Sequence, residues 1–162
     1  MRSIIYQIAR APIGKEDYVD VDNVYAGEFV SIDYVYELDD ETRKEAITTL
    51  ATNILPKGLF TLNEDGCSLT YMGGLNKWKQ NHVDRLIGIA KTLTPKNVLK
   101  YIGPLYDIQK SLINPLNTAS IFVIGTEGNS GTAEKSGELL CMLDYLKVGD
   151  KIYIGEVFGY HI

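Results

Sequence analysis

The stretch from Ala119 to Leu146 reads ASIFVIG, then TEGNSG, then TAEKSGELLCMLDYL. Its unbroken apolar run, Ile121 to Ile124, is typical of a buried strand. The loop that follows has glycines at Gly125, Gly128 and Gly131, and a helical pattern comes after it. No other part of the sequence shows this order. The stretch therefore predicts a strand that leads through a glycine loop into a helix.

A glycine loop that opens onto a helix can present several backbone N–H groups to an anion. The candidate ligand-binding residues of this loop are Gly125, Gly128, Gly131, Thr132 and Lys135. The loop lacks the lysine that follows the last glycine of a Walker loop, and its glycine spacing differs from the dinucleotide fingerprint. The simpler interpretation is a surface loop whose glycines permit tight turns, and anion binding stays open beside it.

The size and composition predict one globular domain over residues 1–162. The hydrophobic fraction is 45% and the charged fraction 23%, which is ordinary for a folded domain. No apolar run resembles a signal peptide or approaches the length of a membrane span, so no membrane association is expected. The two cysteines, Cys67 and Cys141, lie far apart in the sequence. Their spacing favours buried thiols in a reducing compartment, and the cytoplasm is the expected location.

Patterns on either side of the opening stretch predict strands and helices that are grouped more than they alternate. The expected strands are Ser3–Ala9, Phe29–Leu38, Leu59–Leu62, Cys67–Met72 and Ile152–Ile162, with a loop or edge strand after Gly14. The expected helices follow Asp39 or Asp40 as a cap, span Leu75–Leu93, start at Thr94-Pro95 and span Leu105–Ile113. This order predicts an α+β fold, with a largely antiparallel or mixed sheet of about five or six strands packed against four or five helices.

The charge is distributed unevenly along the chain. Ten acids and no Lys or Arg occur between Glu16 and Glu41, so that segment carries a formal charge of −10 while the whole chain carries −5. Asp17, Asp20 and Asp22 do not fit the calcium-loop pattern, and no metal site or cofactor is predicted. A solvated acidic surface is the plain interpretation. A surface that attracts a basic protein partner is the functional interpretation. Its predicted partner-binding residues are Asp17, Tyr18, Asp20, Asp22 and Tyr25, and Phe29 is a further aromatic anchor.

Residues typical of catalysis do not form a recognisable group in the sequence. His82 lies in the apolar stripe of its helix and His161 lies next to the end of the chain. The lysines and the arginine near Trp78 are spread around the central helices, and the sequence pI is about 5.0, so direct nucleic-acid binding is not expected. The sequence therefore favours a noncatalytic protein-binding or regulatory module that uses its acidic segment, over a small anion- or phosphate-binding enzyme that uses residues 125–135. It does not indicate an oligomeric state.

Overall fold

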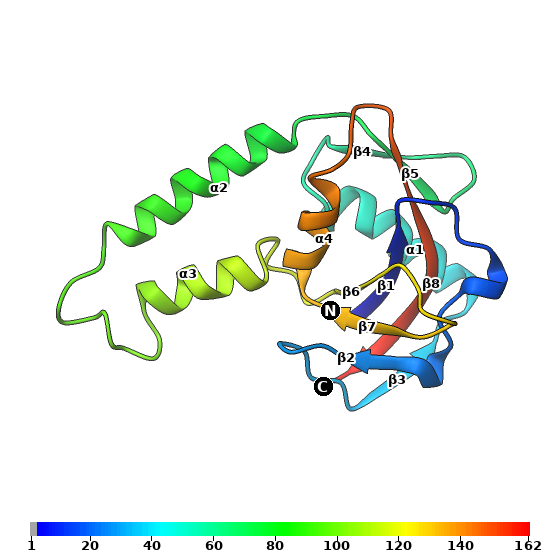
Figure 1. Ribbon diagram of the computed structural model, residues 1–162, viewed down its shortest axis with the longest axis horizontal. Coiled ribbons are helices and arrows are strands. Elements are labelled where there is room, and N and C mark those ends of the chain that lie inside the picture. Colours follow the sequence, from blue (N-terminus) through cyan, green and yellow to red (C-terminus); the bar gives the residue numbers. More distant parts are fainter. Residues whose placement is uncertain (1–2) are drawn as a thin grey trace.

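A mixed β-sheet forms the centre of the molecule in the computed structural model, which describes residues 3–162 (Figure 1). The described residues form eight strands: β1 (Ser3–Ala9), β2 (Val24–Ala26), β3 (Tyr34–Glu37), β4 (Phe60–Leu62), β5 (Ser68–Tyr71), β6 (Ile121–Ile124), β7 (Gly131–Glu134) and β8 (Lys151–His161). They also form four α-helices: α1 (Asp40–Thr49), α2 (Leu75–Ala90), α3 (Pro104–Ile113) and α4 (Ser136–Leu143). Three short turns complete the set: η1 (Lys15–Asp17), η2 (Val21–Asn23) and the π-helical turn η3 (Leu50–Ile54).

The strand order is β2-β7-β6-β1-β8-β5-β4, and β3 pairs with β8 beyond the end of β5. The β1–β6 and β2–β7 pairs are parallel and the other pairs are antiparallel, so the predicted α+β fold with a mixed sheet is confirmed. The described residues contain more strands than the predicted five or six. The additional ones, β2 and β7, have only three and four residues, too few to give a clear alternation.

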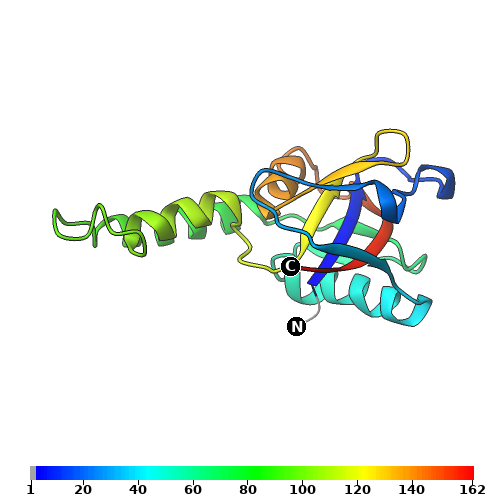
Figure 2. The ribbon, with the colours of Figure 1, turned by 90° about the horizontal axis from the view of Figure 1, so that it is seen from below.

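Both faces of the sheet bury apolar side chains. In β1, Ile4, Tyr6 and Ile8 belong to a first core with Leu50 of η3 and Leu139 of α4. The alternate residue Ile5 belongs to a second core with Ile121, Val123, Phe158 and Tyr160. Because successive side chains of a strand point to opposite faces, β1 contributes to both cores and lies at the centre of the fold. Figure 2 shows α1 on one side of β1 and β8, with the β2 segment on the other.

Helices α2 and α3 form an arm, residues 75–113, that projects away from the remainder of the molecule, which we call the body (Figures 1 and 2). Only Leu75 of α2 and Ser111 of α3 are buried. The predicted helix that starts at Thr94-Pro95 is wrong, since this segment forms turns at the tip of the arm. Short helices depend on tertiary packing, and the tip has no surface of the body to pack against.

The opening stretch folds differently from its prediction. Residues Gly131–Glu134 form β7, which pairs with β6 on one side and β2 on the other, so the glycine loop joins two strands of a hairpin. The helix begins only at Ser136. A Cβ atom on Gly131 would lie 2.2 Å from the Val123 side chain, so this glycine permits close packing of β7 on β6. Tertiary pairing therefore determines the strand conformation of a segment whose sequence resembles a helix start.

The alternation in Phe29–Leu38 predicts one long strand with Val30, Ile32, Tyr34, Tyr36 and Leu38 on its buried face. Both the length and this orientation are wrong. Only Tyr34–Glu37 pairs with β8, and Tyr34 and Tyr36 are exposed whereas Val35 packs against the second core. Val30 packs into the same core from the loop before the strand. The inward-facing residues are therefore even-numbered at Val30 but odd-numbered at Val35, so a single alternation does not run through the whole segment. The Tyr36 ring lies over Gly159, where a Cβ atom would be 2.1 Å from the ring.

The prediction of buried thiols is wrong for Cys141, which is exposed, and Cys67 is partly exposed. In α4 the inward positions are occupied by Leu139, Met142 and Leu143, which places Cys141 on the outer side. The cap of α1 follows the prediction, because the Asp39 side chain accepts a hydrogen bond of 2.7 Å from the backbone N–H of Thr42.

Candidate functional site

The acidic segment, residues Glu16–Glu41, covers the open side of the second core. It contains η1, η2, β2 and β3, and it ends in the first turn of α1. β2 is the last strand of the sheet, and β3 contacts η2 in addition to pairing with β8. Val19, Val30 and Val35 point into the core, so the charged residues between them are directed outward. In Figure 1 this segment follows the right side and the lower edge of the body, and the arm extends to the left.

All ten carboxylates of the acidic segment are exposed: Glu16, Asp17, Asp20, Asp22, Glu28, Asp33, Glu37, Asp39, Asp40 and Glu41. Asp39 is engaged as the cap of α1. Of the other nine, only Asp33 takes part in an ion pair within residues 3–162, with His161 at 4.0 Å. Folding therefore does not bring lysines or arginines into ion pairs with these nine carboxylates, and the segment keeps a concentrated negative charge.

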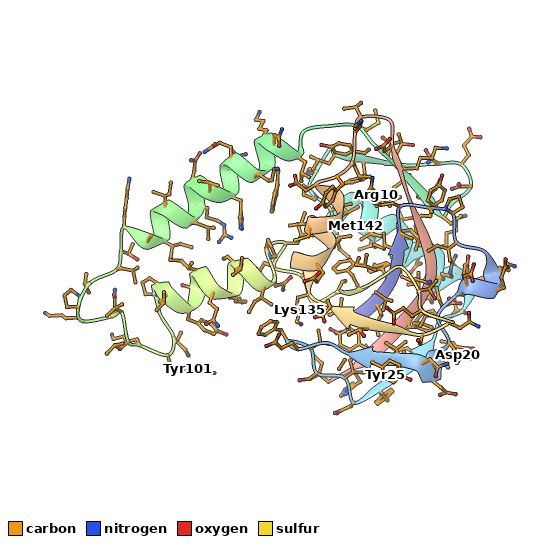
Figure 3. All side chains as sticks on the ribbon, viewed as in Figure 1. Arg10, Asp20, Tyr25, Tyr101, Lys135 and Met142 are labelled. Atoms are coloured by element: carbon orange, nitrogen blue, oxygen red, sulfur yellow. The ribbon has the colours of Figure 1, made fainter. Side chains whose placement is uncertain are left out.

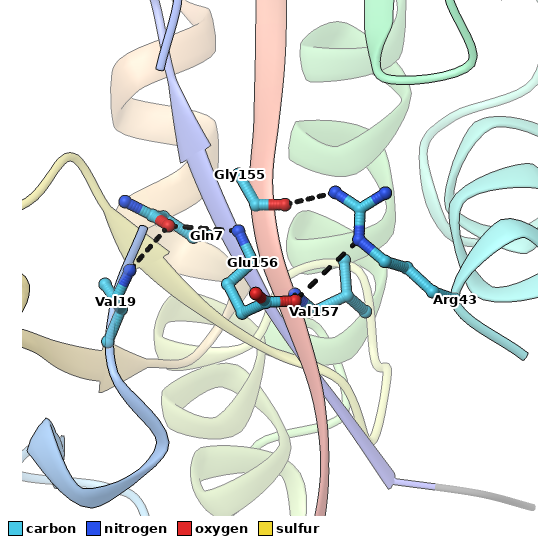
Figure 4. Close-up of polar contacts among 6 residues, drawn as sticks. All are labelled: Gln7, Val19, Arg43, Gly155, Glu156 and Val157. Carbon is cyan, nitrogen blue, oxygen red and sulfur yellow. Dashed lines mark hydrogen bonds and ion pairs between the residues drawn. The ribbon is translucent and has the colours of Figure 1, made fainter. Parts of the chain in front are cut away.

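Gln7 fixes the start of this segment to the centre of the sheet. Its side chain is 1% exposed and uses all of its hydrogen-bonding capacity. Figure 4 shows the two hydrogen bonds that its Oε1 atom accepts. Gln7 Oε1 accepts hydrogen bonds from the backbone N–H groups of Val19, at 3.1 Å, and Glu156, at 3.0 Å. Gln7 Nε2 donates to the carbonyl oxygens of Asp17, at 3.0 Å, and Gly125, at 3.4 Å. One buried amide thus holds the acidic segment, the glycine hairpin and β8 together.

The place of Gln7 is a β-bulge, where Tyr6 pairs with Val157 but Ile8 pairs with Ile154. The extra residue of β8 leaves backbone groups without strand partners, and side chains satisfy them. Arg43 donates a hydrogen bond of 2.6 Å to the Gly155 carbonyl and forms an ion pair of 3.8 Å with Glu156 (Figure 4). Its guanidinium also lies 6.0 Å from the centre of the Tyr18 ring. Arg43 is therefore engaged with β8, although it lies beside the acidic segment.

Large aromatic side chains are exposed among the carboxylates. The exposed fractions are 56% for Tyr25, 50% for Phe29, 57% for Tyr34 and 39% for Tyr36, while Tyr18 is half-buried. Figure 3 shows Asp20 and Tyr25 at the same lower edge of the body. Exposed Tyr and Phe are enriched in protein interfaces, where they bury a large area at a small cost in conformational entropy. Tyr34 and Tyr36 were not among the predicted partner-binding residues, because the sequence pattern assigned them to a buried strand face.

The glycine hairpin does not form an anion-binding helix N-terminus. Gly125 and Gly128 have φ angles of +76° and +59° and shape the turn, and Gly131 and Thr132 belong to β7. The first turn of α4 is closed by the chain itself: Ser136 Oγ donates a hydrogen bond of 2.6 Å to the Asn114 side chain and accepts one from the backbone N–H of Leu116. Among the five predicted ligand residues, Lys135 lines a groove that lies beside α3.

Carboxylates surround the base of the hairpin as well. Burial raises the pKa of the Glu134 carboxyl, and the neighbouring Glu138 carboxylate raises it further. Burial lowers the pKa of the Lys135 ammonium. An anion placed at this end of the hairpin would therefore meet one partly desolvated lysine between two acids.

A separate cavity of about 610 Å³ lies between β1, α1 and the segment before β6, and no sequence pattern predicted it. Ile4, Tyr6 and Ala46 form its apolar part, and Glu45 and Asn53 are among its polar lining residues. The Tyr6 hydroxyl donates a hydrogen bond of 2.9 Å to the Ala46 carbonyl, and burial raises its pKa, so it stays protonated at neutral pH. The lining comes from three distant segments, which no local pattern could connect.

Residues 3–162 contain neither a cluster of three potential metal ligands nor a helix long and apolar enough to cross a bilayer. No family model matches the chain, and no curated protein or solved structure is significantly similar to it.

Proposed function

We propose that the protein is a noncatalytic protein-binding module whose acidic segment binds a basic partner. The observation that carries this proposal is the exposure of all ten carboxylates of residues Glu16–Glu41, nine of them without a Lys or Arg ion-pair partner among the described residues. Four exposed aromatic side chains lie between them. Charge of one sign raises the rate of encounter with an oppositely charged partner, and aromatic anchors provide the buried contacts that hold it.

The anchoring of the segment to the sheet supports the same function. Its start is fixed by the buried side chain of Gln7, and its apolar residues fill the second core. A surface that is already ordered loses little conformational entropy on binding, which leaves more of the contact energy as affinity.

The proposal is tested with a fluorescent peptide in which Lys and Leu alternate. The wild-type protein should bind it, and the affinity should fall steeply as the salt concentration rises, because exposed charges are screened over about 8–10 Å at physiological ionic strength. The variant D17N/D20N/D22N should bind at least about 10-fold more weakly, a change of about 1.4 kcal/mol. The matched control E64Q/D84N/D107N removes three exposed carboxylates away from the acidic segment and should bind like the wild type.

An affinity that does not change with salt would contradict the proposal, as would an equal loss in both triple variants. The variant Y25A separates the aromatic contribution, since it leaves every charge in place.

The alternative, a small anion- or phosphate-binding enzyme that uses residues 125–135, stays a prediction. A cytoplasmic location also stays a prediction, resting on the two widely spaced cysteines. The geometry gives the enzyme less support than the binding module, because the glycines shape a hairpin and Lys135 turns toward a different surface.

A further inference from the structure

The arm carries a net positive charge, opposite in sign to that of the acidic segment. Residues 75–113 contain seven Lys and Arg against two Asp, a formal charge of +5. The arm also exposes apolar side chains that the body does not cover: Leu99 is 94% exposed, Tyr101 86% and Ile102 76%. A projecting helical hairpin with large exposed apolar side chains is unusual for a surface that has no partner.

A groove of about 710 Å³ follows the side of α3 that faces away from the Arg85–Ser111 contact with α2. Leu105, Tyr106 and Ile113 of α3 form its floor. Tyr101 at the tip of the arm and Phe29 of the body are among the residues at its ends. Figure 3 shows Tyr101 near the tip and Lys135 where the arm meets the body, with α3 between them. α3 has ten residues, a length of about 15 Å, so the floor can accommodate two to three helical turns.

The charges that line the groove are all positive. Lys100, Lys110 and Lys135 belong to the lining, and no Asp or Glu does so within the part of the chain that the structure describes. Burial lowers the pKa of Lys135, which shows that its ammonium has lost part of its hydration. Glu134 and Glu138 lie close to Lys135 in the sequence, but neither lines the groove and neither forms an ion pair with Lys135 within residues 3–162, so a carboxylate in the groove would reach the ammonium from the side away from these acids.

The form of the groove favours a helical ligand. Its floor is the side-chain surface of a helix, which offers no free backbone N–H or C=O groups to an added strand. A helix satisfies its own backbone hydrogen bonds and can place one apolar face on such a floor. A flat bilayer could reach the exposed tip residues but not Ile113 and Lys135 at the base of the arm. Two copies of the groove would bring lysines together, which opposes self-association.

We propose that the α3 groove binds an acidic amphipathic helix of a partner protein, with its apolar side on Leu105, Tyr106 and Ile113 and its carboxylates near Lys100, Lys110 and Lys135. This site meets the acidic segment at Phe29, but it does not depend on the function proposed for that segment, because its α3 floor and its lysines lie outside residues Glu16–Glu41. Together the two surfaces would let one molecule bind a basic and an acidic partner at the same time.

The test uses a labelled 14-residue helical peptide with leucines on one face and glutamates on the other, measured by fluorescence anisotropy. We expect saturable binding to the wild-type protein, and K100E/K110E should weaken it at least about 10-fold. The matched control K44E/K147E makes the same change in net charge at two exposed lysines outside the groove and should stay within about 2-fold. L105S/Y106S should also weaken binding at least about 10-fold without any change in charge.

Several results would overturn the proposal. These are no saturable binding of the acidic peptide up to about 1 mM, an equal loss in K100E/K110E and K44E/K147E, and displacement of the peptide by vesicles rich in anionic lipid. Concentration-dependent dimerisation that L105S/Y106S abolishes would assign the groove to a second copy of the chain and would also refute it. Thermal unfolding of each variant establishes that it is folded. Binding of the basic Lys–Leu peptide should be unaffected by L105S/Y106S, so failure at the groove and failure at the acidic segment give different results.

Discussion

Replacing Gln7 with Leu tests the anchoring of the acidic segment. The substitution keeps the volume and the burial of the side chain but removes every hydrogen bond that it makes. The backbone N–H groups of Val19 and Glu156 lose their acceptor, at a cost of about 1–3 kcal/mol each for buried groups. Added apolar burial offsets about 1 kcal/mol of this loss.

The expected net loss of unfolding free energy is therefore about 3 kcal/mol. For a domain of this size, each kcal/mol lowers the Tm by about 2–4 °C, so Q7L should melt about 6–12 °C below the wild type. Circular dichroism during heating and urea titration measures both quantities. The matched control is Gln80→Leu, at an exposed position on α2, which should change stability by less than about 0.5 kcal/mol.

Amide hydrogen exchange gives a second, local result. In Q7L the amide of Val19 should lose protection before the strands of the sheet do, because the anchor of the segment is gone while the strand pairing remains. A stability within about 1 kcal/mol of the wild type would refute the reasoning about buried amide groups. An unchanged protection of Val19 would refute the claim that Gln7 fixes the acidic segment.

Three further substitutions have defined expectations. Glu134→Gln should raise the Tm at neutral pH and have little effect at about pH 4. The reason is that the folded-state pKa of the Glu134 carboxyl is raised, so the folded wild type is most stable when Glu134 is protonated and loses stability as the pH rises through that pKa. If the stability gained from Glu134→Gln instead increased as the pH is lowered, this reasoning would be contradicted. Leu139→Ala should lower the unfolding free energy by about 2–5 kcal/mol in urea titration, since the side chain is 0% exposed in the first core, and a loss below about 1 kcal/mol would contradict its place there. Leu99→Ser should leave the unfolding free energy within about 0.5 kcal/mol, because this side chain makes almost no contact in the monomer, and a larger loss would show that the tip is packed.

The sequence predicted those elements whose pattern is long and whose ends carry clear signals. The strand Ser3–Ala9, the cap at Asp39 and the two strands on either side of Gly66, where φ is +71°, all appear as expected. These features depend on contacts between residues close in the chain, or on the spacing at which side chains of a strand or helix return to the same face. The same holds for α2, whose apolar stripe extends over 16 residues.

Elements that depend on distant partners were predicted less well. Gly131–Glu134 is a strand because it pairs with β6 on one side and with β2 on the other. β6 precedes it in the hairpin, but β2 lies far earlier in the sequence, so no local pattern could reveal that pairing. The segment after Pro95 carries helix-start residues but has nothing to pack against, so it stays a turn. In both cases the local preference is weak and the tertiary environment decides.

The candidate sites divide in the same way. The sequence alone determined that ten carboxylates lie in one segment and that the remainder of the chain is net positive, because charge is a property of composition. Only the tertiary structure decided that nine of those carboxylates lack a Lys or Arg ion pair among the described residues, that Gln7 holds their segment to the sheet, and that Lys100, Lys110 and Lys135 line one groove. Pairing, anchoring and grooves require side chains from separate segments to meet, and the folded chain alone defines which ones do so.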